Sequence, residues 1–170
     1  MQIIRTLFQI LFFKAKPSDV PFNINLTVIA FGLAWSSNIL LASFQNVVNN
    51  QTLIPLLQIV VLGAMIALFL TINNKKSRIY QTLLSSYGVM VLINLALIVI
   101  SLIGLQGTVF IFAIWSFAVQ VYILKNALDT GIASAFFMTF AIQVMVIFSM
   151  AIFFPGFLEE FSAAIQAANA

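Results

Sequence analysis

Residues 79–105 read IYQTLLSSYGVMVLINLALIVISLIGL, an apolar run of the chain that contains no charged side chain. A helix that crosses the hydrocarbon core of a bilayer needs about 20 mostly apolar residues. Backbone polar groups must also be satisfied internally in lipid, which favours a helix over any open strand. This stretch therefore predicts a transmembrane helix, and the rest of the chain can be read outward from it.

Four further segments qualify in the same way, residues 22–44, 52–72, 108–124 and 131–154. Short polar connections separate them, among them QNVVNNQ at 45–51 and NNKKSR at 73–78. The break at 106–107 is the weakest, and without it a four-span chain would result. We expect an all-α, polytopic membrane helical bundle of five spans, forming a single membrane domain over residues 1–170.

The composition excludes several classes of protein. The chain is 63% hydrophobic and 6% charged, whereas soluble domains carry about 25% charged residues. It has no cysteine and no histidine, which removes disulfides, thiol nucleophiles and the usual general base near neutral pH. The net charge of +3 comes from basic residues too few and too scattered to bind nucleic acid.

The basic residues predict the orientation. With a cytosolic N-terminus, five spans place every Lys and Arg on the cytosolic side, where the positive-inside rule expects them. A four-span chain would move Lys125 to the outside and break this pattern. We therefore expect an N-in, C-out topology with these cytosolic basic residues: Arg5, Lys14, Lys16, Lys75, Lys76, Arg78 and Lys125.

Residues 2–14 precede the first span and form an amphipathic segment that we expect to lie as a helix in the cytosolic interface. A signal peptide is the alternative, but no small-residue cleavage site follows. The elbow FFKAKPSDVPFN at 12–23 then turns the chain into the membrane, with Ser18 or Asp19 expected to cap the first span and Pro21 in its first turn. Residues 155–170 form a short external tail, either frayed or interfacial.

Polar residues within the spans are the candidate functional positions. Such groups are costly in lipid and usually face the bundle interior. One interpretation makes them contacts between helices, and the sharper one a polar path or a lipid headgroup pocket. The candidate residues are Asn38, Gln58, Tyr87, Asn94, Trp115, Gln120, Tyr122 and Gln143.

Asp129 is the acidic residue of greatest interest, because it lies at the cytosolic boundary. It is expected to pair with Lys125 or Arg78, or to cap the last span. Intramembrane aspartyl catalysis needs two neighbouring carboxylates, and the chain carries no metalloprotease, nucleophile-elbow or phosphate-loop motif. We expect no catalytic residue, no metal and no cofactor. The cytosolic charges, Asp129 among them, are candidate contacts for anionic lipid headgroups.

Several motifs resemble the Yip1-domain membrane proteins, in particular small bacterial members. They are RIYQTL at 78–83, Trp115, LKNALDTGIASAF at 124–136 and the PSDVP joint at 17–21. The resemblance implies a five-span inner-membrane protein without established catalytic residues. Eukaryotic members act in vesicle trafficking through a longer cytosolic region, so their Rab-binding role is not carried over.

These observations predict a non-enzymatic protein, integral to the membrane with several spans and expected in the bacterial inner membrane. It would act by association, as a scaffold or an accessory subunit, with the lipid bilayer, other membrane proteins or its own copies as partners. The alternative is a small transporter, channel subunit or lipid-handling protein that uses the polar residues of the last three spans. An enzyme would need an unrecognised metal or cofactor.

Overall fold

The computed structural model describes residues 2–44, 52–105, 108–154 and 156. The expected connection at 45–51, the turn at 106–107 and the tail at 157–170 lie outside the described residues. Six α-helices and two short 3₁₀ turns make up the described chain, and no strand occurs in it. The α-helices are α1 (Gln2–Leu11), α2 (Ile24–Phe44), α3 (Leu53–Ile72), α4 (Ile79–Ile103), α5 (Val109–Leu128) and α6 (Ile132–Phe153).

Helices α2 to α6 are each long and apolar enough to cross a membrane. The prediction of an all-α chain with five spans is thus confirmed, and α4 and α5 are separate helices. The chain is a multi-pass membrane protein. The largest difference from the expected boundaries is at α5, which continues to Leu128 and so has Lys125 in its last turn. Helix α2 begins two residues later than expected, at Ile24, α4 ends two residues earlier, at Ile103, and the remaining differences are of one residue.

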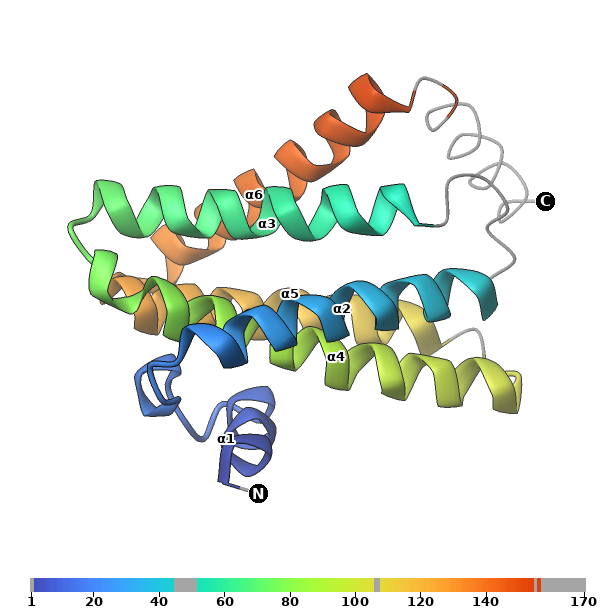
Figure 1. Ribbon diagram of the computed structural model, residues 1–170, viewed down its shortest axis with the longest axis horizontal. Coiled ribbons are helices and arrows are strands. Elements are labelled where there is room, and N and C mark those ends of the chain that lie inside the picture. Colours follow the sequence, from blue (N-terminus) through green and yellow to red (C-terminus); the bar gives the residue numbers. More distant parts are fainter. Residues whose placement is uncertain (1, 45–51, 106–107, 155, 157–170) are drawn as a thin grey trace.

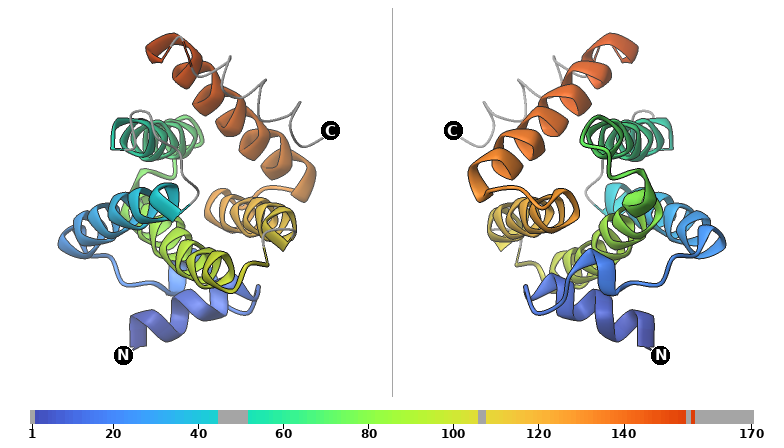
Figure 2. Two further views of the ribbon diagram at one scale, coloured as in Figure 1. Left: turned by 90° about the vertical axis from the view of Figure 1, so that its right-hand side faces the viewer. Right: turned by 90° about the vertical axis from the view of Figure 1, so that its left-hand side faces the viewer.

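The five long helices alternate in direction along the bundle (Figure 1). Helix α4 lies at its centre and packs against α1, α2, α3 and α5. Helix α6 packs against α3 and α5 and is inclined to the other long helices (Figure 2). Helix α1 lies crosswise beside α4, near the end of the bundle where α2 begins (Figures 1 and 2).

The interior of the bundle is filled by large aliphatic side chains. Ile66 of α3, Ile123 of α5 and Ile142 of α6 are completely buried. The outer surface is equally apolar, for example at Phe110 and Phe137, which are about 70% exposed. A soluble protein rarely shows contiguous apolar surface on this scale, whereas lipid solvates it.

Four helices end with one residue in the left-handed conformation, which turns the chain sharply. These residues are Phe13, Asn74, Gly104 and Asp129, with φ between 55° and 80°. After α1, the N–H groups of Phe13 and Lys14 donate to the carbonyls of Ile10 and Gln9, at 2.9 and 2.7 Å. Glycine and asparagine tolerate this conformation, but it is uncommon for phenylalanine. Here the ring contacts of Phe13 with Trp115 and Tyr122 hold it in place.

The elbow after α1 caps the first span differently from expectation. Asp19 accepts a hydrogen bond from the N–H of Lys16, at 2.7 Å, and so closes the 3₁₀ turn Pro17–Asp19. The side chain of Asn23 accepts the N–H of Leu26 at the start of α2, at 3.1 Å. The prediction of Ser18 or Asp19 as the cap was wrong, because Val20 is extended and the next three residues, Pro21 among them, are not helical, so α2 begins only at Ile24.

Candidate functional site

The predicted polar residues within the spans do not converge on one site. Asn94 of α4 is 5% exposed, and its Nδ2 donates to Oγ of Ser37 on α2, at 3.0 Å. Ser37 in turn donates to the carbonyl of Ala34, at 2.9 Å. Asn38 donates to the same carbonyl and contacts the sulfur of Met90, at 3.0 and 3.3 Å. These groups join α2 to α4.

Two more of the predicted residues join α4 to its other neighbours. The hydroxyl of Tyr87 donates to the carbonyl of Ile59 on α3, at 3.3 Å. It lies so close to Gly63 that a Cβ atom there would overlap it. Gln120 of α5 donates to Oγ of Ser86 on α4, at 3.2 Å. Of these two contacts, the one between α3 and α4 depends on Gly63, whose missing side chain permits the close approach of the two helices.

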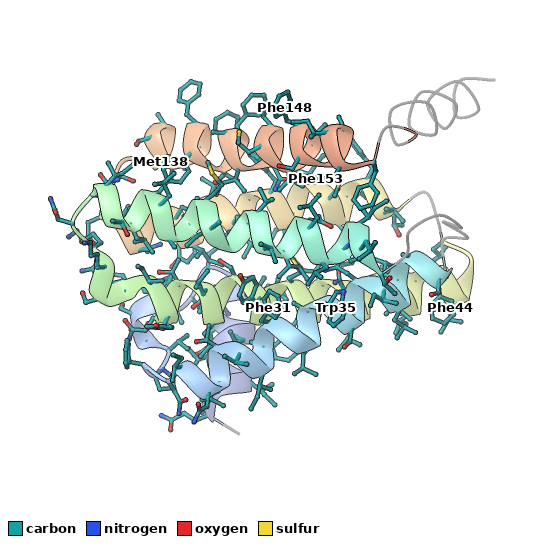
Figure 3. All side chains as sticks on the ribbon, turned by 45° about the horizontal axis from the view of Figure 1, so that its top comes forward. Phe31, Trp35, Phe44, Met138, Phe148 and Phe153 are labelled. Carbon is teal, nitrogen blue, oxygen red and sulfur yellow. The ribbon has the colours of Figure 1, made fainter. Side chains whose placement is uncertain are left out.

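The remaining polar candidates lie elsewhere. Gln58 on α3 and Gln143 on α6 are half-buried. Within the described residues, neither side chain hydrogen-bonds to a neighbouring helix. Trp115 and Tyr122 of α5 face the N-terminal elbow instead of another span. Figure 3 shows Phe31 and Trp35 on the side of α2 toward α3, where the Trp35 indole donates to the carbonyl of Thr52, at 3.0 Å.

Phe13 fastens the elbow to α5. Its ring lies edge-on to Trp115 and to Tyr122, with centroids 5.1 and 5.2 Å away. Its carbonyl accepts the Tyr122 hydroxyl, at 3.2 Å. These contacts stabilise the left-handed backbone of Phe13, which costs about 1–3 kcal/mol in a side chain of this size. Sequence reasoning missed this role, although the seven-residue spacing of Trp115 and Tyr122 does place them on one helix face.

Helix α1 docks onto α4 through a second close approach. Leu7 is buried against Gly88, where an added Cβ would meet the Leu7 side chain at 2.6 Å. Ile10 is completely buried. The opposite side of α1 exposes Ile4 and Phe8. The helix is thus packed on the bundle and still presents an apolar side outward.

One cluster of charges links the two connections at the end of the bundle where α3 and α5 terminate. Nζ of Lys75 and Nη1 of Arg78 both lie 2.7 Å from Oδ2 of Asp129. Arg78 also donates to the carbonyls of Asn126 and Ala127, at 3.4 and 3.0 Å. The hydrogen bond from Lys75, with a smaller contribution from Arg78, lowers the pKa of Asp129. Of the predicted partners, Arg78 is present, and Lys75 takes the place proposed for Lys125.

The other five basic residues belong to the same end of the bundle, called here the basic end: the start of α2 with α1, the α3–α4 joint and the α5–α6 joint. All five are exposed, and none is paired with a carboxylate in the part of the chain that the structure describes. They are Arg5, Lys14, Lys16, Lys76 and Lys125.

Two apolar grooves flank the elbow. The α1 groove, of about 460 Å³, lies between α1, α4 and α5 and is lined by residues such as Phe8, Ile93 and Trp115. The α5–α6 groove, of about 410 Å³, runs beside Phe13 and has Lys125 in its wall. Within the described residues no group of acidic side chains is arranged to hold a metal ion. Neither protein-family models nor curated proteins nor solved structures match the chain.

Proposed function

We propose that this chain is a non-enzymatic protein of the bacterial inner membrane, related to the Yip1-domain proteins, that acts by association as a scaffold or accessory subunit. The observation that carries the proposal is the use of the intramembrane polar groups. Asn94, Tyr87 and Gln120 each bond to a neighbouring helix. Polar groups that hold helices together are not arranged along a shared path.

The energies support this interpretation. A hydrogen bond between transmembrane helices contributes about 0.6 kcal/mol on average. Three such bonds join α4 to α2, α3 and α5, and together they favour one arrangement of the bundle. A rigid bundle with an apolar exterior suits a protein whose task is to bind other membrane components.

The same proposal includes the orientation, with the basic end in the cytosol. Helix α1 would then lie in the cytosolic leaflet, because it runs crosswise to the spans and exposes Ile4 and Phe8 to lipid. Phe13 anchors its end to α5, so α1 would keep a constant position relative to the spans.

Thiol accessibility tests the proposal against the transporter alternative. The natural chain contains no cysteine, so Asn94→Cys, Gln120→Cys and Gln143→Cys can each be examined alone in native membranes with a charged maleimide. We expect protection at all three positions and rapid labelling of the exposed control Lys76→Cys. Labelling of all three positions at the rate of the control would contradict the proposal and would favour the alternative, a water-filled path through the bundle.

Association itself is tested by crosslinking in the membrane. A photoreactive amino acid is placed at Phe140 on α6 or at Val28 on α2, both of which are more than half exposed. We expect a discrete protein adduct from at least one position, and a matching oligomer or complex after extraction in mild detergent. Only lipid adducts at both positions, together with a monodisperse monomer, would contradict the proposal.

A further inference from the structure

The α5–α6 groove has the shape of a site for one lipid chain. It extends along α5 from Ile114 to Lys125, two residues that lie about 16 Å apart along the helix axis at 1.5 Å per residue. One leaflet of the hydrocarbon core is about 15 Å thick. Phe117 and Val121 of α5, with Ile132 and Phe136 of α6, supply apolar walls. The groove therefore matches an acyl chain of a single leaflet in length and in polarity.

The mouth of the groove is positively charged. Lys125 lines it. Lys14 lies next to it, because the preceding residue, Phe13, also lines the groove. The carbonyl of Phe13 accepts the hydroxyl of Tyr122, one helical turn before Lys125. Both lysines are exposed. The nearby carboxylate of Asp129 is already bound by Lys75 and Arg78. Among the described residues, these two lysines thus have no anionic partner.

An apolar groove one leaflet long with two unpaired cations at its mouth is complementary to one kind of molecule. We propose that the groove binds an anionic phospholipid of the leaflet at the basic end, with an acyl chain along α5 and α6 and its phosphate at Lys14 and Lys125. A phospholipid fits better than a second copy of the chain, because the two lysines need an anionic partner and the outer surface of another copy is apolar at this depth. This inference does not depend on the proposed function.

Native mass spectrometry of the full chain in detergent micelles tests the site. The micelles are titrated with phosphatidylglycerol or with phosphatidylcholine of the same acyl chains, and bound lipids are counted. Each basic residue near an anionic headgroup contributes appreciably to binding, so Lys14→Gln with Lys125→Gln is expected to lower the preference for phosphatidylglycerol about tenfold. The matched control, Lys16→Gln with Lys76→Gln, removes two exposed charges from the same end and is expected to retain the preference.

A second pair of variants tests the groove without changing any charge. Ala118 lines the groove, so Ala118→Phe is expected to fill it and to abolish tight binding of both lipids. Ala113 is exposed on α5 and does not line the groove, so Ala113→Phe controls for the added ring. Thermal unfolding without added lipid shows whether each variant is folded.

Three outcomes would overturn the site. Equal loss in the two double-lysine variants would mean that only the overall charge attracts the lipid. An unchanged preference in Lys14→Gln with Lys125→Gln would remove the two lysines from the site. Tight binding by a folded Ala118→Phe variant would show that no acyl chain occupies the groove.

Discussion

Helices α2 and α4 form one kind of interface, and α6 forms another. Between α2 and α4 the contacts include the buried bond from Asn94 to Ser37 and small side chains such as Ala30 and Ala34. Within the described residues, α6 makes no side-chain hydrogen bond to another helix. Its Thr139 and Ser149 donate to carbonyls of α6 itself, and Figure 3 shows Phe148 and Phe153 along this helix.

The difference teaches where the specificity of a lipid-solvated bundle comes from. Apolar side chains gain little by leaving lipid for another helix, so packing and hydrogen bonds select the neighbours. The helices around α4 have both. Helix α6 packs without a described side-chain hydrogen bond to another helix, and it is held near its start by the adjoining Asp129 cluster. We therefore expect the centre of the bundle to be sensitive to small changes and α6 to tolerate them.

The largest effect is expected where α3 and α4 approach most closely. Gly63→Ala places a methyl group onto the Tyr87 hydroxyl, and such overpacking costs about 1–3 kcal/mol. The free energy of unfolding, measured by titration with a denaturing detergent, should fall by this amount. Gly32→Ala is the control, because a Cβ at Gly32 meets no atom within 4 Å; its stability should be unchanged or slightly higher.

A second substitution identifies the cause of that loss. Tyr87→Phe removes the hydroxyl, after which the nearest ring atom, Cζ, would lie 3.4 Å from the new Cβ, an ordinary contact. The double variant Gly63→Ala with Tyr87→Phe should recover most of the stability lost in Gly63→Ala. Additive losses would show that the overlap with Tyr87 is not the reason.

A smaller effect is expected for the bond between α2 and α4. Asn94→Ala and Ser37→Ala, combined in a double-mutant cycle, should give a coupling energy of about 0.6 kcal/mol, within the range measured for bonds between transmembrane helices. Ser149→Ala on α6 should change stability by almost nothing, since its hydroxyl bonds within its own helix. A Ser149 effect as large as the coupling would remove the distinction between the two regions.

The smallest effect on stability is expected at the start of α6, next to Asp129. Asp129→Asn weakens the link to Lys75 and Arg78, and amide hydrogen exchange at the start of α6 should rise while exchange in α2 and α4 stays constant. Asp19→Asn, which changes a carboxylate of the same end that lies outside any described ion pair, should leave α6 unaffected.

The direction of the pKa shift of Asp129 predicts how the stability of the fold depends on pH. The pKa of Asp129 is lower in the folded chain than its ordinary value of 3.8, so the carboxylate stabilises the fold above that value and loses this contribution as the pH falls through the lower folded pKa. The free energy of unfolding in detergent should therefore be lower at about pH 2 than at about pH 6 in the natural chain, and this difference should be smaller in Asp129→Asn. Equal acid sensitivity of the two chains would mean that the cluster does not contribute.

Much of the fold was predictable from the order of apolar and polar residues, because helix length in a membrane follows from bilayer thickness. The five spans emerged this way. The polar residues within them were also identifiable, since each is unusual in its surroundings. Their partners were not: Tyr87 bonds to a carbonyl of Ile59, and carbonyls leave no trace in the pattern of side chains. Phe13 was overlooked for a related reason, because a phenylalanine in an apolar chain carries no signal of a special backbone conformation.

The sequence by itself determined that this protein is a five-span helical membrane protein whose basic residues belong to one end, because charge and hydropathy act residue by residue. Only the tertiary structure decided which helices touch, that Gly63 and Gly88 permit two close approaches, and that Lys75 rather than Lys125 pairs with Asp129. Such choices depend on shape and on hydrogen bonds between residues far apart in the chain. In lipid, where apolar side chains have little preference among neighbours, these contacts are what remain to select one arrangement.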